Sequence, residues 1–180
     1  MRERPILFTA PMVRAILDDR KTMTRRAVKP QPTLDHGLVF EGIALGKFGA
    51  VSDSVIACPY GTIGDRLWLR EAWAGGVDFG TVIYKADGTE LPPYNGARWY
   101  PSIHMFRRDS RITLEITNVR VERLHEITEE DAEKEGVSFT QYTNANARLH
   151  FMELWDSIYG NKYPRSSNPW VWVIEFRKVK

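Results

Sequence analysis

Residues 11–17 carry apolar side chains at helical spacing. The members that fall on one face are Met12, Ala15 and Ile16, with Val13 and Leu17 widening that face. Pro11 suits the first position of a helix, because the amide hydrogen that proline lacks would have no acceptor there. The acidic residues 18–19 end the apolar face, and the β-branched Thr22 and Thr24 favour an extended strand. The pattern predicts a buried helix followed at once by a strand.

Two further helices are predicted in the second half of the chain. Residues 144–159 have one apolar stripe, which Thr143 can cap and Gly160 can end. The stripe consists of Ala147, Phe151, Leu154, Trp155 and Ile158, and we expect its aromatic members in the core. A shorter helix is predicted to end at Glu135, because Thr128 and Asp131 approximate a capping box and Gly136 follows.

Alternating or short apolar runs predict the strands. They occupy residues 6–8, 40–44, 66–73, 82–85 and 170–176. The longest pattern begins at Arg111, and its apolar members are Ile112, Leu114, Ile116, Val119 and Val121. These residues move from even to odd positions, and a slip in a period of two requires one extra residue. We therefore expect a β-bulge or a tight bend near residues 117–118.

Length and composition favour one domain. The chain has 180 residues, of which 43% are hydrophobic, and it contains a single cysteine. We expect no internal disulfide, no metal site and no cofactor, because the histidines also lack ligand spacing. No apolar run is long enough to span a membrane and no signal-peptide core follows the N-terminus, so we expect a cytoplasmic protein.

Basic residues are clustered although the formal net charge is only +2. The clusters lie in residues 20–29 and 107–111. Such a cluster is either a solvated face or, if both clusters flank one cleft, a site for a polyanion.

Four motifs occur in a fixed order along the chain. Residues 16–26 read Ile-Leu-Asp-Asp-Arg-Lys-Thr-Met-Thr-Arg-Arg, and residues 64–69 read Gly-Asp-Arg-Leu-Trp-Leu. Residues 127–136 read Ile-Thr-Glu-Glu-Asp-Ala-Glu-Lys-Glu-Gly, and residues 172–176 read Trp-Val-Ile-Glu-Phe. In order and spacing, over roughly half of the chain, these motifs resemble the ASCH domain, a family related to the PUA RNA-binding domains.

The resemblance implies an α+β fold, with a small PUA-like β-barrel flanked by about three α-helices. It also implies a single domain, 1–180. Residues 27–63 and 74–110 have no counterpart in the compact family members. We interpret these segments as insertions that close the pocket or reshape it for another substrate.

The resemblance also implies an activity. The family members most similar around residues 16–26 hydrolyse N(4)-acetylcytidine to cytidine and acetate, and they use a lysine, a threonine and a glutamate. By position in the motifs these residues correspond to Lys21, Thr24 and Glu135, with Glu133 as a near competitor for the last. We expect Lys21 and Thr24 at an exposed strand start.

Amide hydrolysis needs a nucleophile, a base and donors for the oxyanion. Thr24 could attack and Lys21 could take its proton, if desolvation lowers the pKa of the lysine. Glu135 would then orient Lys21 or shuttle the proton. A carboxylate beside a lysine favours the charged form, in which case Lys21 would stabilise the oxyanion and Glu135 would activate water.

Geometry sets a condition on this trio. Residues 21 and 24 point to opposite faces of an ideal strand, so their cooperation requires Lys21 to lie in the turn before the strand. The alternative is an ordinary salt bridge between Lys21 and Glu135, with Thr24 on the surface.

Other candidates for substrate binding follow from position. Arg26 should face the same way as Thr24 and could contact the pyrimidine ring or a phosphate, whereas Arg20 and Arg25 are expected to be peripheral. The remaining candidates are Arg70, Glu71, Ser102 and His104. An ion pair between strands is the alternative for Arg70 and Glu71, and anchoring of a loop is the alternative for Ser102 and His104.

Three functions therefore remain open. The leading one is an amidohydrolase of an acetylated pyrimidine nucleoside, because binding alone does not need the combination of Lys21, Thr24 and Glu135. The alternatives, with RNA as partner, are a non-catalytic RNA-binding module and an ASCH-type ribonuclease.

Overall fold

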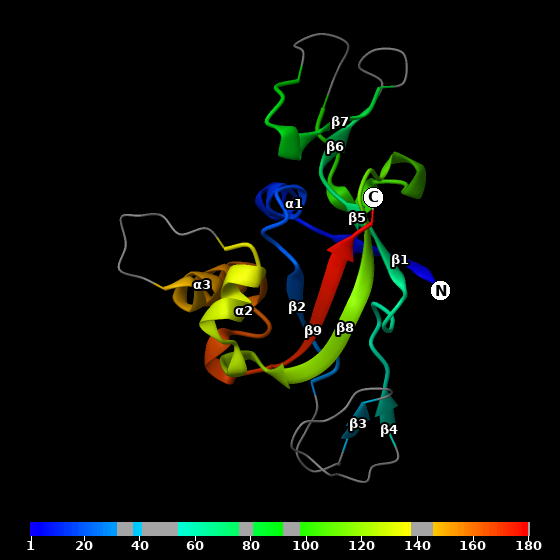
Figure 1. Ribbon diagram of the computed structural model, residues 1–180. Coiled ribbons are helices and arrows are strands. Elements are labelled where there is room, and N and C mark those ends of the chain that lie inside the picture. The colour runs from blue at the N-terminus through cyan, green and yellow to red at the C-terminus, as the bar shows by residue number, and fades with distance from the viewer. Residues whose placement is uncertain (32–37, 41–53, 76–80, 92–97, 138–145, 180) are drawn as a thin grey trace.

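The fold is α+β, with one mixed sheet and three α-helices in the described part of the chain (Figure 1). The computed structural model describes residues 1–31, 38–40, 54–75, 81–91, 98–137 and 146–179. The helices are α1 (Ala10–Leu17), α2 (Glu129–Lys134) and α3 (Ala147–Tyr159). No helix among the described residues is both long and apolar enough to cross a membrane.

The main sheet has five strands. In spatial order they are β1 (Glu3–Leu7), β5 (Arg66–Arg70), β8 (Thr113–Arg123), β9 (Trp170–Lys178) and β2 (Met23–Ala27). β1 pairs with β5 in parallel, and the other neighbours are antiparallel. Two small sheets stand apart from it at opposite ends of the molecule (Figure 1), namely β3 (Leu38–Phe40) with β4 (Ser54–Ile56), and β6 (Trp73–Ala74) with β7 (Ile83–Tyr84).

The main sheet is curled, but its edges are not joined by a backbone ladder. β1 and β2 are the two edge strands, and no pairing between them closes a barrel in the described part of the chain. A side chain nevertheless spans the gap, because Arg26 on β2 donates a hydrogen bond of 3.0 Å to the carbonyl oxygen of Leu7 on β1. The two edges therefore lie within reach of one arginine.

The slip in the pattern of the long strand is a β-bulge, as predicted. Ile116 pairs with Phe176 and Asn118 pairs with Glu175, so the register between β8 and β9 shifts at Thr117. The extra residue bends the strand, and β8 is strongly curved in Figure 1.

Both faces of the sheet are covered, because the helices lie on opposite sides of it. Trp172 and Ile174 of β9 pack in one apolar cluster with α1, whereas Val171 and Val173 pack in a second cluster with α2 and α3. The continuous apolar run of residues 170–176 is therefore a strand buried on both faces.

Several predicted boundaries differ from the structure; the strand predicted at 66–73, for example, is divided between β5 and β6. α3 begins at Ala147, where Asn146 caps it by accepting a hydrogen bond from the Leu149 amide, and the predicted cap Thr143 lies outside the described residues. Ile158 belongs to the predicted apolar stripe but is 49% exposed, and it lines a cavity instead of the core. Of the predicted strand at 40–44, only Phe40 is described, as the last residue of β3.

Candidate active site

The end of α1 places Lys21 ahead of the strand. Asp19 adopts a left-handed conformation with φ of 57°, and the amide of Lys21 donates a hydrogen bond of 2.9 Å back to the carbonyl of Ala15. The chain therefore turns sharply, and β2 begins only at Met23. Lys21 lies in the turn, which is the condition that its cooperation with Thr24 requires.

Glu135 is held opposite Lys21 by backbone contacts. It caps the C-terminus of α2, and its backbone forms an antiparallel bridge with Lys21. The neighbouring amide of Thr22 donates a hydrogen bond of 2.9 Å to the carbonyl of Lys134. At the other end of α2 the Thr128 hydroxyl accepts a hydrogen bond from the Asp131 amide, as the capping pattern predicts. The glutamate is thus fixed on both sides.

Gly136 allows these two segments to approach each other. Its φ is +78°, a conformation that favours glycine, and a Cβ atom there would lie 2.8 Å from the Cβ atoms of both Ala15 and Lys21. No larger residue fits between α1 and the end of α2 without displacing the lysine.

Lys21 and Glu135 form a buried ion pair. The lysine Nζ atom lies 2.7 Å from Oε2 of Glu135, and the side chains are 0% and 3% exposed. Nζ also donates hydrogen bonds of 2.7 Å to the backbone carbonyls of Glu135 and Met23. The expectation that Lys21 is exposed was wrong, because the turn directs its side chain under α2.

Burial and charge act on Lys21 in opposite directions. Burial is the larger effect and lowers the pKa of the ammonium group below its usual value, while the Glu135 carboxylate opposes that change. All three donors of the ammonium have oxygen acceptors, and Glu135 Oε2 is close enough to receive one of the protons.

Thr24 is fully buried, so the expectation of an exposed strand start was wrong for this residue too. Its Oγ1 accepts a hydrogen bond of 2.6 Å from Nη1 of Arg26, which confirms that the two side chains share one face of β2. The Met23 carbonyl, which belongs to the peptide bond joining Met23 to Thr24, accepts a hydrogen bond from Lys21. Lys21 therefore contacts the backbone next to Thr24, but no hydrogen bond between described residues joins the lysine to the threonine hydroxyl.

Arg25 was expected to be peripheral, and this is wrong. Its side chain is 0% exposed, and its guanidinium lies 3.5 Å from Oε1 of Glu135 and 2.6 Å from Oδ2 of Asp131. It also forms an ion pair with Glu122 on β8. Burial works against the charge, but the carboxylates of Glu135 and Glu122 outweigh it and raise the pKa of Arg25. Arg25 thus holds the second oxygen of Glu135 while Lys21 holds the first.

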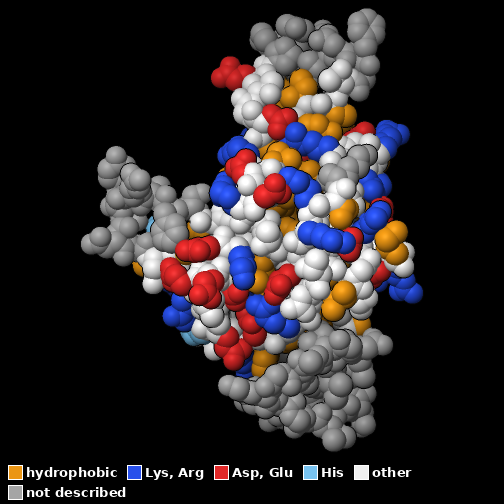
Figure 2. Space-filling view, viewed as in Figure 1, with side chains coloured by type: hydrophobic (Ala, Val, Ile, Leu, Met, Phe, Trp, Pro, Cys, Tyr) orange, Lys and Arg blue, Asp and Glu red, His pale blue; other side chains and the backbone are white. Residues whose placement is uncertain are grey.

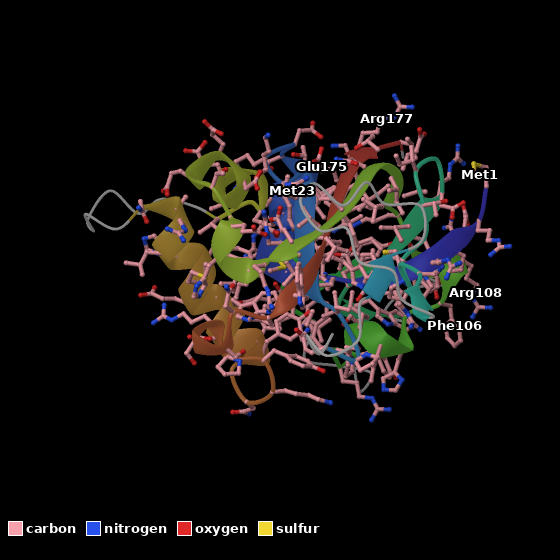
Figure 3. The ribbon with its side chains drawn as sticks, turned by 90° about the horizontal axis from the view of Figure 1, so that it is seen from below. Met1, Met23, Phe106, Arg108, Glu175 and Arg177 are labelled. Atoms are coloured by element: carbon pink, nitrogen blue, oxygen red, sulfur yellow. The ribbon has the colours of Figure 1, made fainter. Side chains whose placement is uncertain are left out.

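The network around Arg25 extends across the surface of the sheet. Arg120 on β8 forms ion pairs with Glu122, Asp131 and Glu175. Figure 2 shows acidic side chains gathered over α2 with basic side chains beside them. In Figure 3, Met23 and Glu175 lie side by side where β2 meets β9. These contacts fasten α2 to the sheet, and with it Glu135.

A cavity of about 830 Å³ lies on the Thr24 side of β2. Its lining includes Phe8, Arg26 and Ser102, but not Lys21, Thr24 or Glu135. The Phe8 ring lines the cavity and also lies close to Lys21 and Arg26. Its centroid is 5.7 Å from Lys21 Nζ and 5.1 Å from the Arg26 guanidinium. The trio is therefore shielded from the cavity by Phe8 and Arg26.

The other four predicted binding residues differ in whether they line the cavity. Ser102 lines the cavity, whereas Arg70, Glu71 and His104 do not. Glu71 is buried in a bidentate pair with Arg111, with distances of 2.9 and 3.1 Å, and burial raises the pKa of its carboxyl while Arg111 opposes that rise. Arg70 donates a hydrogen bond of 3.0 Å to the Met105 carbonyl. Among the described residues, an ion pair is therefore found for Glu71, with Arg111 ahead of β8, but not for Arg70, and His104 is exposed.

Sequence reasoning missed two features of this site. Phe8 is apolar and reads as core, and only the fold brings it between Arg26 and Lys21. Tyr60 lies in the turn-rich segment just before the motif at residues 64–69 and outside that motif, yet it lines the same cavity, and burial raises its pKa while Arg26 opposes that rise. No periodicity marks either residue as part of a site.

The described residues contain no group of three or more His, Cys, Asp or Glu side chains that could hold a metal ion. A scan against protein-family models found no match for the chain, and searches of curated proteins and of solved structures found none either.

Proposed function

We propose that this protein is an amidohydrolase that removes the acetyl group from N(4)-acetylcytidine, in an ASCH-type fold with a PUA-like curled sheet. The observation that carries the proposal is the buried Lys21–Glu135 pair, which contacts the backbone beside the buried hydroxyl of Thr24. The bridge that Arg26 makes between β1 and β2 supports the barrel-like curvature.

The chemistry assigns one role to each side chain. Thr24 Oγ attacks the acetyl carbonyl carbon and forms a C–O bond, while its proton passes to Lys21 and a lysine proton passes to Glu135. The C–N bond then breaks, the amine of cytosine leaves with a proton from the pair, and water releases acetate from Thr24. Lys21 and Glu135 end the cycle in the protonation states in which they began it, so water is the single co-reactant that the reaction needs.

Access to Thr24, and contact between its hydroxyl and Lys21, require a local rearrangement, because Lys21 Nζ is bonded to Glu135 and to the Met23 carbonyl. The Thr24 hydroxyl is bonded to Arg26, and Arg26 and Phe8 line the cavity in front of it. A substrate that enters the cavity replaces the contact between Arg26 and Thr24, and the guanidinium is then free to contact the carbonyl of the pyrimidine ring. Arg26 thus both covers the nucleophile and recognises the base.

The test is direct. The folded protein is incubated with N(4)-acetylcytidine, and cytidine is separated and measured by absorbance. We expect turnover in the wild type and in the control Thr22→Ala, whose side chain is exposed on the same stretch, and none in Thr24→Val. Absence of turnover in a wild-type sample whose folding is verified overturns the proposal.

A second candidate function, RNA binding, is favoured by one surface feature. The Phe106 ring is 57% exposed, and the Arg108 guanidinium lies 5.0 Å from its centroid. Exposed aromatic rings with arginines beside them are platforms on which unpaired bases stack. Figure 3 shows both residues at the end of the molecule opposite α3.

Titration of single-stranded RNA at two salt concentrations tests this second candidate. Phosphate contacts predict an affinity that falls steeply as the salt concentration rises, and Phe106→Ala should weaken it. Shortening of the RNA during the titration would instead indicate a ribonuclease. Equal, weak binding by the wild type and Phe106→Ala would exclude this surface as an RNA platform.

A further inference from the structure

The cavity beside Thr24 carries more positive charge than an uncharged nucleoside needs. Three cationic residues line it, namely Arg26, Lys29 and Lys85, and none of the described lining residues is acidic. A cavity lined by charge of one sign concentrates ligands of the opposite sign.

The two lysines are available to a ligand. Both are exposed, and no carboxylate within the described part of the chain pairs with Lys29 or Lys85. Arg26, the arginine that lines the cavity, is in contrast bonded to the Thr24 hydroxyl and to the backbone carbonyls of Arg25 and Leu7. Unpaired lysines at the rim of a cavity can bind an anion without first breaking an internal ion pair.

The lysines approach the cavity from different elements. Lys29 follows the end of β2, whereas Lys85 begins a short 3-10 helix. The backbone amide of Lys85 donates a hydrogen bond to the Ala72 carbonyl. That helix packs beside α1, since Arg14 donates a hydrogen bond of 3.1 Å to the Ala86 carbonyl. The first turn of α1 also lines the cavity, and no side chain caps the amides of Ala10 and Met12.

The rest of the lining suits an aromatic base. Phe8, Tyr60 and Tyr159 are among the lining residues, and a volume of about 830 Å³ lies in the range of cavities that enclose a small organic ligand. The cavity therefore combines aromatic walls with unpaired cations.

We propose that this cavity binds a pyrimidine nucleotide, and that the substrate of the enzyme carries a phosphate group, which the positive charge of Lys29 and Lys85 attracts into the cavity. The identity of the base rests on the proposed hydrolase function. The phosphate subsite does not, because it follows from the charges of the cavity itself.

Calorimetric titration of four small probes tests the phosphate subsite. The probes are cytidine, cytidine 5′-monophosphate, ribose and ribose 5-phosphate, at low and moderate ionic strength. We expect each phosphorylated probe to bind about tenfold more tightly than its partner at low salt, and the difference to shrink as salt screens the charges. Equal affinities within each pair overturn the proposal.

Two matched double variants locate the effect. Lys29→Gln with Lys85→Gln should abolish the preference for phosphate and leave the affinity for cytidine within about twofold. Lys134→Gln with Lys162→Gln removes the same charge from exposed lysines outside the cavity and should retain the preference. A loss of preference in both variants overturns the subsite, because only net charge would then matter.

The outcomes also separate this inference from the proposed function. A preference for ribose 5-phosphate that depends on Lys29 and Lys85 supports the subsite even if N(4)-acetylcytidine is not hydrolysed. Hydrolysis of N(4)-acetylcytidine without any phosphate preference supports the function and overturns the subsite. A short single-stranded RNA could also bind far more tightly than the mononucleotide, with the same dependence on the lysines. That result overturns the proposal that the ligand is a mononucleotide and indicates a nucleic-acid polymer.

Discussion

Lys21 Nζ lies 2.7 Å from Glu135 Oε2, although the two residues are 114 positions apart in the chain. The pair joins the turn before β2 to the end of α2, and almost no part of either side chain is exposed. Removing one partner of a buried ion pair costs more than the pair itself contributes, because the remaining charge stays in a region of low polarity. The same contact therefore matters for both chemistry and stability.

Replacement of Lys21 by methionine should destabilise the protein. The Glu135 carboxylate would keep only Arg25, at 3.5 Å, and we expect a loss of about 3 kcal/mol or more in the free energy of unfolding. Urea denaturation measures the loss. The double variant Lys21→Met with Glu135→Gln should recover part of it, since no isolated charge remains. A single variant as stable as the wild type would contradict the buried pair.

Thr24→Val should abolish hydrolysis while leaving the protein folded. Valine keeps the shape of threonine, and the lost hydrogen bond from Arg26 costs about 1 kcal/mol of stability. Thr24→Ser keeps a hydroxyl and should retain measurable turnover of N(4)-acetylcytidine. Full activity of Thr24→Val would remove the threonine from the mechanism.

The pH dependence of hydrolysis should report on Lys21. Burial lowers its pKa from the usual 10.5, so the folded protein loses this proton at lower pH than the unfolded chain does. If the neutral amine takes the proton of Thr24, kcat/KM rises as the pH passes through the lowered pKa. A rate that falls over the same range would assign the ammonium form to the oxyanion instead.

The lowered pKa of Lys21 also makes the stability of the protein depend on pH. Between the folded pKa of Lys21 and 10.5, the unfolded chain binds more protons than the folded protein, so the contribution of this residue to stability increases with pH. Denaturation midpoints of the wild type and of Lys21→Met, compared across that range, isolate the contribution. A midpoint difference that does not vary with pH would contradict the lowered pKa.

Gly136→Ala should displace Lys21 and destabilise the protein by about 1 to 3 kcal/mol. The new Cβ atom would meet Ala15 and Lys21 at 2.8 Å, in addition to the strain of a φ of +78°. Gly88→Ala is the matched control, because its φ of +75° brings the same strain but no atom lies within 4 Å. Thermal or urea denaturation of both should show the larger loss for Gly136→Ala. Equal losses would mean that backbone strain alone accounts for the effect.

The local pattern of the sequence determined much of this fold. The helix before β2, the bulge in β8, the end of α2 at Lys134 with Glu135 as its C-cap, and the buried β9 all follow, to within a residue or a few, from hydrophobic period, capping residues and turn chemistry. Each of these features depends on side chains only a few positions apart. A period of two that slips by one residue, for example, requires an extra residue in the strand, which here forms a bulge.

Only the tertiary structure decided how these elements meet. It buried Lys21 and Thr24, which local pattern placed at an exposed strand start, and it put Arg25 between Glu122, Asp131 and Glu135. It also placed Phe8 between Arg26 and Lys21. Whether a charged side chain is buried depends on which distant carboxylates pack around it. The sequence near an arginine or a lysine does not predict which carboxylates these are.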